Sequence, residues 1–338
     1  MNTFLLFLFS LISITQLGSQ EFTKFRLMTF NILQGGGNAK NVGFGNELFG
    51  GSRIDEIASA IKLARADVVG IQEDCSSKSN VILNELGDGW YRAGKVYSKF
   101  PAKLIHSNKD RSLEVVDVKL AGSRVVRIVN CHWWPNNYGP FLAQEKLRAD
   151  PQVDLNILAK IVEEKGARRG GSRGYKATIE PLEEAIEEKK AIFLVGDFNE
   201  PSHLDWTEYY ARNGTDRWVD NPTDIPLRFP VRWPGSVLLE IIGMVDSFRQ
   251  VHTDEVKKPG NTWTPPYPER TSGRRPYGDQ VLDRIDRIYH YGNDVKVVSA
   301  QVVGEKGDTS DIVIQGRWPS DHRAVVIEYK WKGTDHDK

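Results

Sequence analysis

Several short apolar runs in this 338-residue sequence lead into or follow a polar residue that could bind a metal or move a proton. These residues are Asn31, Glu73, His132, Asp197, Asn199, Asp286, Asp321 and His322. Because polar residues at strand ends meet on one rim of an α/β domain, we expect them to share a site. Each alone could be a solvated turn residue or a hydrogen-bonded histidine, but six such strand ends together favour a functional site.

Carboxylates are prominent in this set, and they would repel one another on a shared rim. A bound cation would relieve that repulsion. Oxygen ligands without cysteine favour a hard ion, Mg²⁺, Mn²⁺ or Ca²⁺, over zinc. The histidines and asparagines add a base for water, donors to phosphoryl oxygens and a proton source for a leaving group. The sequence therefore predicts metal-dependent hydrolysis of a phosphoester bond.

The elements that must position these residues alternate along the chain. Apolar, β-branched runs predict strands at residues 25–32, 68–72, 113–118, 125–130, 192–195, 285–290, 295–303 and 324–329. Ile54, Ile57, Ile61 and Ala64 share one face of a predicted helix, and further helical stretches are expected within residues 142–164 and 179–190. This alternation predicts one α/β domain over residues 22–333.

The N-terminal residues differ from the rest in composition. Residues 4–14 are apolar, and no charged residue precedes Glu21. This run is too short to span a bilayer, which needs about 20 residues. It predicts a signal peptide over residues 1–20 and a secreted or periplasmic protein, the alternative being a buried N-terminal helix.

Charge and cysteine content limit the function further. Lys plus Arg and Asp plus Glu both number 45, so a nucleic-acid partner would need a local basic patch. The two basic candidates are the loops at residues 166–176 and 262–279. Cys75 and Cys131 are too few for a multi-cysteine zinc site, and two buried free thiols are favoured over one disulfide bond.

The ordered motifs TFN, GIQE, NCHWW, GDFNEP, RIDRIY and SDHRAV resemble those of the endonuclease/exonuclease/phosphatase superfamily. That superfamily includes pancreatic-type deoxyribonucleases, abasic-site endonucleases, neutral sphingomyelinases and inositol-polyphosphate 5-phosphatases. The resemblance covers essentially the whole chain after the predicted signal peptide. It implies a four-layer α/β sandwich, with two packed, largely antiparallel sheets flanked by helices and the site at one end.

The resemblance also implies the role of each metal-site residue. Glu73 matches the principal metal ligand, Asp321 would complete the metal site, and Asn31 would help to position the ion or its ligands. Asp197 and Asn199 would orient the attacking water and hold a phosphoryl oxygen.

The same resemblance assigns the acid and base chemistry. His322 would be the general base, and Asp286 would fix its tautomer. The motif register favours Asp286 over Asp283, which is expected to be a salt-bridging surface residue. His132 would contact the phosphate, as in deoxyribonucleases and sphingomyelinases, whereas abasic-site endonucleases carry a tyrosine there.

The substrate is less well defined by the sequence. Trp133 and Trp134, beside His132, and Arg274 and Arg275, in the second basic loop, are candidate substrate contacts, although rim packing explains the tryptophans equally well. Nuclease is the first subtype to test, and sphingomyelinase-like or small-molecule phosphatase activity stays open. The complete residue set favours an enzyme over an inactive module that binds nucleic acid or phospholipid. A monomer without an obligate protein partner is expected.

Overall fold

The computed structural model describes residues 22–41, 47–75, 79–109, 112–121, 124–168, 174–214, 226–263 and 282–331. The predicted signal peptide, Arg274 and Arg275 lie outside these ranges, as do residues 169–173 of the first basic loop. Among the described residues, no helix is both long enough and apolar enough to cross a membrane.

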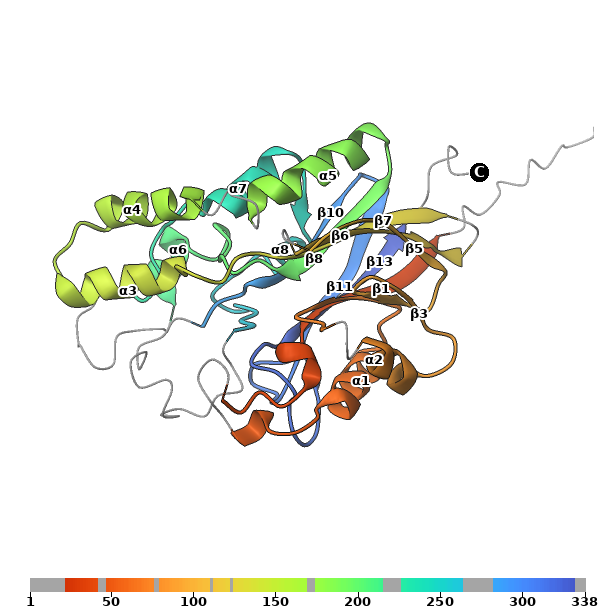
Figure 1. The fold of residues 1–338 in the computed structure, drawn as a ribbon. Helices are drawn as coiled ribbons and strands as arrows, with labels where there is room; N and C mark the ends of the chain where they lie inside the picture. Colours follow the sequence, from red (N-terminus) through yellow and green to blue (C-terminus); the bar gives the residue numbers. More distant parts are fainter. Residues whose placement is uncertain are drawn as a thin grey trace, which may run out of the picture.

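Two mixed β-sheets pack face to face at the centre of the molecule (Figure 1). The seven-stranded sheet has the order β12 (Ile312–Val313), β11 (Val295–Gly304), β13 (Ala324–Trp331), β1 (Thr23–Asn31), β2 (Val68–Gln72), β4 (Val96–Ser98), β3 (Tyr91–Ala93). The six-stranded sheet has the order β5 (Ala102–Asn108), β6 (Leu113–Lys119), β7 (Val125–His132), β8 (Ala191–Asp197), β10 (Asp286–Tyr291), β9 (Val245–Asp246). Most neighbouring strands are antiparallel, and β1–β2, β7–β8 and β11–β12 are parallel.

An apolar layer joins the two sheets. Phe25 and Leu27 of β1 belong to the same buried cluster as Phe193 of β8 and Ile288 of β10. The rings of Phe25 and Phe193 meet edge to face, with their centroids 5.2 Å apart. Burial of this apolar surface holds the sheets together and so fixes the relative positions of their strand ends.

Helices cover both outer faces. Helices α1 (Ile54–Leu63) and α2 (Ser79–Leu86) lie on the seven-stranded sheet, where Ile57 and Ile61 pack with Phe30 and Ile71. On the other face, α5 (Tyr175–Glu187) contacts β7 and β8, and α7 (Pro234–Ile241) contacts β9. Helix α4 (Leu155–Arg168) packs on α7, and α3 (Gly139–Ala149) packs on α4, with α6 (Glu208–Asn213) near them (Figure 1). Helix α8 (Ser247–Val251) contacts β10 and β11. This arrangement confirms the expected four-layer α/β sandwich (Figure 1).

All eight predicted strands are present, together with the predicted helix at residues 54–64. The helical stretch expected within residues 142–164 is divided into α3 and α4, because the chain turns at Asp150 and Pro151. Pro151 has no backbone N–H, so a helix that continued through it would lose one backbone hydrogen bond. Five short or exposed strands, β3, β4, β5, β9 and β12, were not predicted.

Candidate active site

Strand register brings the predicted site residues to one end of the two sheets. Asn31 and Glu73 lie at the adjacent ends of the parallel strands β1 and β2. In the other sheet, His132 at the end of β7 and Asp286 at the start of β10 both lie opposite Asp197 of β8. The side-chain amide of Asn31 joins the two sheets at this end, donating to Asp197 Oδ2 at 2.9 Å.

His322 stands in the middle of this group, just before β13. Its Nδ1 lies 2.9 Å from Asp286 Oδ2, and its Nε2 lies 3.8 Å from Asp197 Oδ2 and 3.9 Å from Asp321 Oδ1. All four side chains are at least largely buried. With Nδ1–H donated to Asp286, the Nε2 atom faces the space between the other two aspartates.

The burial of these charges perturbs their ionisation. Burial acts to lower the pKa of His322, but the surrounding aspartates, Asp286 first, raise it well above its ordinary value. Burial, together with the negative charges of Glu73 and Asp197, raises the pKa of Asp321 to about 6. The site therefore holds carboxylates whose charged forms a cation would stabilise.

A turn with a positive φ places Glu73 beside Asn31. Glu73 has a φ of 59°, a conformation that non-glycine residues seldom adopt and that is found disproportionately at functional sites. Its Oε2 accepts a hydrogen bond from the backbone N–H of Gln34 at 2.7 Å, and its Oε1 lies 3.3 Å from Asn31 Nδ2. Glu73 is thus oriented toward Asp197 through the amide that both carboxylates share.

A divalent cation fits this donor set. Asp321 Oδ1 and Asp286 Oδ1 are buried and have no hydrogen-bond partner among the described residues, which is costly for a carboxylate oxygen unless a ligand satisfies it. Ligand atoms of Asp197, Asp286 and His322 also lie within 4.8 Å of one another. The ligand pair expected from the motifs, Glu73 and Asp321, includes one of the two unpartnered carboxylate oxygens, Asp321 Oδ1.

Asn199 and His132 brace Asp197 from two sides. The backbone N–H of Asn199 donates to Asp197 Oδ1 at 2.9 Å, and its side-chain amide donates to the carbonyl of Trp133 at 3.0 Å. His132 Nε2 lies 3.4 Å from Asp197 Oδ2, and its side chain is 16% exposed. The histidine is thus within reach of a bound substrate, at the mouth of the site.

The model of the Endonuclease/Exonuclease/phosphatase family matches residues 28–322, most of the chain. The chain belongs to the endonuclease/exonuclease/phosphatase family. It is therefore a hydrolase that acts on phosphoric ester bonds, and enzymes of this family generally use divalent metal ions. A Caenorhabditis elegans relative, uncharacterized protein F14F9.5, is 28% identical over 320 residues, covering 90% of each chain.

Solved structures similar to this family member share little sequence with it. The human Nocturnin catalytic domain is 13% identical, with a TM-score of 0.49, covering 91% of this chain and 94% of that one. Truncated Caenorhabditis elegans TDP2 is 16% identical, with a TM-score of 0.47, covering 90% and 97% of the two chains.

The expectation for Asp283 was wrong. Asp283 is buried rather than on the surface, and it accepts hydrogen bonds from Tyr138 Oη at 2.6 Å and Trp206 Nε1 at 3.0 Å. It forms no salt bridge within the described part of the chain. His322 contacts Asp286 and not Asp283. Through Tyr138 and Trp206, Asp283 organises the wall of this family member's site without entering it.

The two tryptophans after His132 differ in position. Trp133 is buried, packs edge to face on Phe198 and donates from Nε1 to Thr178 Oγ1, so the expectation that it contacts substrate is corrected. Trp134 is 41% exposed.

The cysteine expectation was correct in part. Neither cysteine forms a disulfide bond, and Cys131 is buried, but Cys75 is exposed.

Sequence reasoning missed the residues that hold His322 and Asp286 in place. Ser320 Oγ accepts from the backbone N–H of His322 at 3.1 Å and donates to the carbonyl of Asn31 at 2.6 Å. Thr262 Oγ1 accepts from the backbone N–H of Asp286 at 3.1 Å. Only Ser320 carried a signal, since it directly precedes the Asp321–His322 pair.

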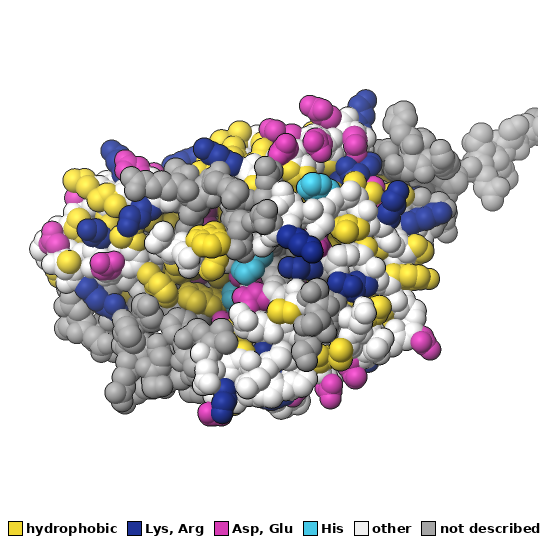
Figure 2. All heavy atoms as spheres, in the orientation of Figure 1, with side chains coloured by type: hydrophobic (Ala, Val, Ile, Leu, Met, Phe, Trp, Pro, Cys, Tyr) yellow, Lys and Arg dark blue, Asp and Glu magenta, His cyan; other side chains and the backbone are white. Residues whose placement is uncertain are grey.

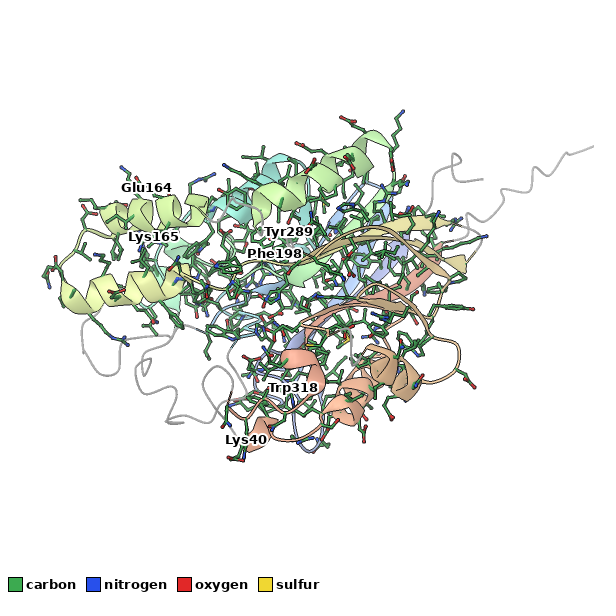
Figure 3. All side chains as sticks on the ribbon, viewed as in Figure 1. Lys40, Glu164, Lys165, Phe198, Tyr289 and Trp318 are labelled. Carbon is green, nitrogen blue, oxygen red and sulfur yellow. The ribbon has the colours of Figure 1, made fainter. Side chains whose placement is uncertain are left out.

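Two further buried side chains support the same loop. Trp318, labelled in Figure 3, donates from its indole Nε1 to the carbonyl of His322 at 2.8 Å. Arg53 is fully buried, and its guanidinium donates to the carbonyls of Pro319, Leu33 and Gly37. These contacts join the loop before β13 to the loop that follows Asn31 at the end of β1.

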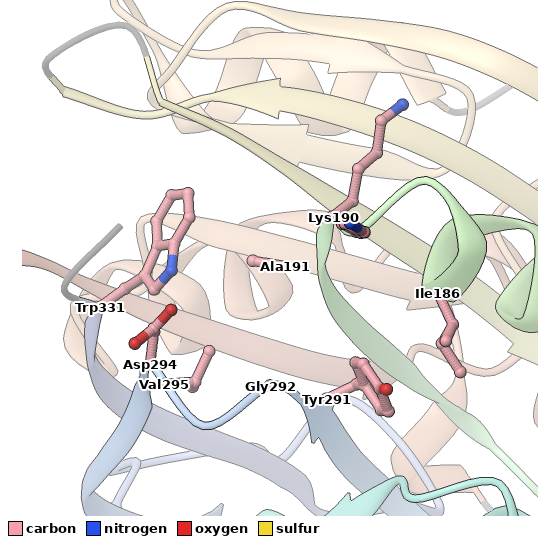
Figure 4. Close-up of a pocket in the computed structure, with 9 residues that line it drawn as sticks. Ile186, Lys190, Ala191, Tyr291, Gly292, Asp294, Val295 and Trp331 are labelled. Carbon is pink, nitrogen blue, oxygen red and sulfur yellow. The ribbon is translucent and has the colours of Figure 1, made fainter. Parts of the chain in front are cut away.

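The surface supports the same placement. Figure 2 shows histidine and acidic side chains together near the middle of one face, with Lys and Arg side chains beside them. A separate cavity of about 190 Å³ lies at the opposite end of the sheets, between Ala191, Tyr291 and Trp331 (Figure 4). None of the predicted site residues lines that cavity.

Proposed function

We propose that this family member hydrolyses a phosphodiester, with a divalent cation held by Glu73 and Asp321 and with water deprotonated by His322. The observation that carries the proposal is the buried His322–Asp286 pair, whose free Nε2 faces Asp197 and Asp321. A histidine oriented in this way by a carboxylate is suited to general-base catalysis. The proposed ion would be Mg²⁺, Mn²⁺ or Ca²⁺.

The chain's own residues supply most of the chemistry. Asp286 accepts a hydrogen bond from Nδ1–H of His322, so Nε2 of His322 can take a proton from water. Asp197, fixed by Asn31 and Asn199, orients that water. Asn31 thus acts by positioning. When bound, the cation polarises the phosphoryl oxygen and stabilises the charge that develops on it.

We propose that His132 and Asn199 hold the phosphate. Both lie around Asp197, and His132 remains partly exposed. Donors at these positions would contact phosphoryl oxygens as negative charge develops, which is the interaction that lowers the barrier most in such sites. Trp134, two residues after His132, is 41% exposed, and an aromatic ring beside a phosphate site can stack on a base, so nuclease is the first subtype that we propose.

A substrate panel tests this function. Plasmid DNA, RNA, sphingomyelin and bis(p-nitrophenyl) phosphate should be incubated with the full chain in Mg²⁺, in Mn²⁺ and in EDTA. We expect cleavage of nucleic acid and of the aryl diester with metal and none in EDTA. Cleavage of sphingomyelin alone would contradict the nuclease subtype, and no metal-dependent turnover on any of the four would contradict the proposed function itself.

We also propose that the protein is exported and is monomeric. The support for export is the apolar run at residues 4–14 with no charge before Glu21. N-terminal sequencing of protein purified from its native source should show the loss of about the first 18–20 residues, and an intact Met1 would contradict export. Light scattering at several concentrations should give the mass of one chain.

A further inference from the structure

A groove of about 490 Å³ opens directly beside the candidate active site. One wall is formed by the ends of β2 and β3 and the turn after β3, and the other by β5, β6 and the end of β7. His132 belongs to both features, since it lines the groove and lies 3.4 Å from Asp197. A substrate held at Asp197 by its scissile phosphate therefore has a path past His132 into the groove.

Three basic side chains line this groove: Arg92 on β3, Lys95 in the turn that follows, and Lys109 after β5. No carboxylate forms an ion pair with any of the three in the part of the chain that the structure describes. The Nε atom of Arg92 is buried there without a hydrogen-bond partner, and its guanidinium lies 6.0 Å from the centroid of the Tyr97 ring. Within the described residues, the groove thus presents three cations that form no ion pair with a carboxylate.

The acidic side chains in the groove are already engaged. Glu114 accepts hydrogen bonds from the backbone N–H of Lys95 and from Ser107 Oγ. Asp74 accepts from Tyr97 Oη at 2.9 Å. Burial raises the pKa of Glu114, while the charges of Lys95 and Arg92 oppose that rise. An incoming anion therefore meets the basic groups rather than an internal salt bridge.

We propose that the groove binds a second phosphate group of the substrate, beyond the phosphate that is cleaved. Charge-assisted hydrogen bonds from Arg92, Lys95 and Lys109 would hold it, with the planar guanidinium suited to paired phosphate oxygens. This inference rests on the proposed function and narrows its substrate class. A choline headgroup carries a positive charge and would be repelled here. A nucleic-acid strand, or a small molecule with two phosphates, matches the charge of the groove.

Equilibrium binding tests the groove without relying on turnover. Calorimetry in EDTA would compare thymidine 5′-monophosphate with thymidine 3′,5′-bisphosphate on the full chain. We expect the bisphosphate to bind about tenfold more tightly or better, as one well-placed charge-assisted contact allows. In the combined variant Arg92→Gln, Lys95→Gln, Lys109→Gln, the two affinities should become nearly equal.

A surface variant controls for the loss of one positive charge in each single groove variant. Lys296 is exposed on β11 and does not line the groove, so Lys296→Gln should keep the wild-type affinity ratio. Thermal melting establishes that each variant is folded, and the three single variants replace the combined one if it is not. Equal affinities in the wild type, or a preference that survives in the groove variants, would overturn the proposal.

Two further experiments are needed. One asks whether the second phosphate belongs to a nucleic acid or to a small molecule, and the other tests the proposed function independently of the groove. Fructose 6-phosphate against fructose 1,6-bisphosphate asks whether any bisphosphate gains affinity, which would favour a small phosphorylated substrate. A gain confined to the nucleotide pair would favour a nucleic-acid strand. Turnover of the dinucleotide TpT in Mn²⁺ tests the proposed function separately. Failure of the groove proposal in the binding assay would therefore leave the turnover result valid, and the reverse also holds.

Discussion

Nδ1 of His322 lies 2.9 Å from Oδ2 of Asp286, and both side chains are buried. The two residues come from different sheets. Asp286 begins β10 of the six-stranded sheet, and His322 lies just before β13 of the seven-stranded sheet. Packing of the sheets therefore creates the pair. The hydrogen bond selects the tautomer in which Nε2 is the acceptor, and Nε2 is the atom that faces Asp197 and Asp321.

Replacing the base should reduce turnover with little effect on the fold. In His322→Ala we expect kcat to fall about 10²–10⁴-fold, the usual contribution of a positioned general base. Steady-state kinetics on bis(p-nitrophenyl) phosphate would measure it, with a melting curve as the check on folding. A kcat within threefold of wild type would contradict the role of His322.

The two aspartates of the DRIDRI motif should separate into two effects. Asp286→Asn should lower kcat in the same range as His322→Ala, because an amide cannot reproduce the charge that orients the imidazole. Asp283→Asn should instead lower the free energy of unfolding by about 1–3 kcal/mol, because one buried acceptor for Tyr138 or Trp206 becomes a donor. Urea titration together with kinetics distinguishes them. The reverse pattern, a large kcat loss only in Asp283→Asn, would show that the assignment is wrong.

Loss of one ligand charge should weaken metal binding. In Glu73→Gln we expect the metal concentration for half-maximal activity to rise at least 10–100-fold, the loss that even an outer-shell change produces. Titration of Mg²⁺ or Mn²⁺ into the EDTA-treated enzyme measures it. Glu47→Gln is the control, since Glu47 is an exposed residue away from the site. An unchanged titration curve in Glu73→Gln would remove Glu73 from the metal site.

Acid should destabilise the protein through His290, a buried residue of β10 outside the candidate active site. Burial lowers the pKa of His290 to about 4, against 6.5 for the free side chain. The folded state therefore favours the neutral imidazole. The associated stability is fully present above pH 6.5 and is lost as the pH falls toward 4. The total amounts to about 3 kcal/mol.

His290→Asn tests this pH dependence. Asparagine does not ionise, and its amide can replace Nδ1 in the 2.9 Å contact with Ser247 Oγ. Urea unfolding at pH 7.5 and pH 4.5 should show a smaller loss of stability in the variant than in the wild type. His106→Asn, at an exposed position on β5, should behave like the wild type. Equal acid sensitivity in wild type and His290→Asn would exclude His290 as the cause.

The predictability of the fold from sequence differed between its central and edge strands. Strands such as β2 and β8 are buried along nearly their whole length, so their continuous apolar runs mark them. Edge strand β5, with the sequence AKLIHSN, is exposed over most of its residues and carries no such run. Strands β3 and β4 have three residues each, too few for a periodic pattern. The groove lined by Arg92 and Lys95 was missed for the same reason.

The site residues were identifiable because each lies next to a strand end, but their contacts depend on packing. Sequence spacing could not show that Trp133 turns into the core while Trp134 remains exposed, since both follow His132 directly. Asp283 and Asp286 both lie among apolar and basic residues, and only the position of Tyr138 and Trp206 in the fold separates their surroundings.

The most direct test of the central claim is the turnover of bis(p-nitrophenyl) phosphate by the purified chain, with and without metal. We expect release of p-nitrophenol in Mn²⁺ or Mg²⁺, its loss in EDTA, and its recovery when metal is added back. Full turnover in EDTA would contradict the cation at Glu73 and Asp321. Absence of turnover with every divalent metal would contradict phosphodiester hydrolysis by His322 and Asp286.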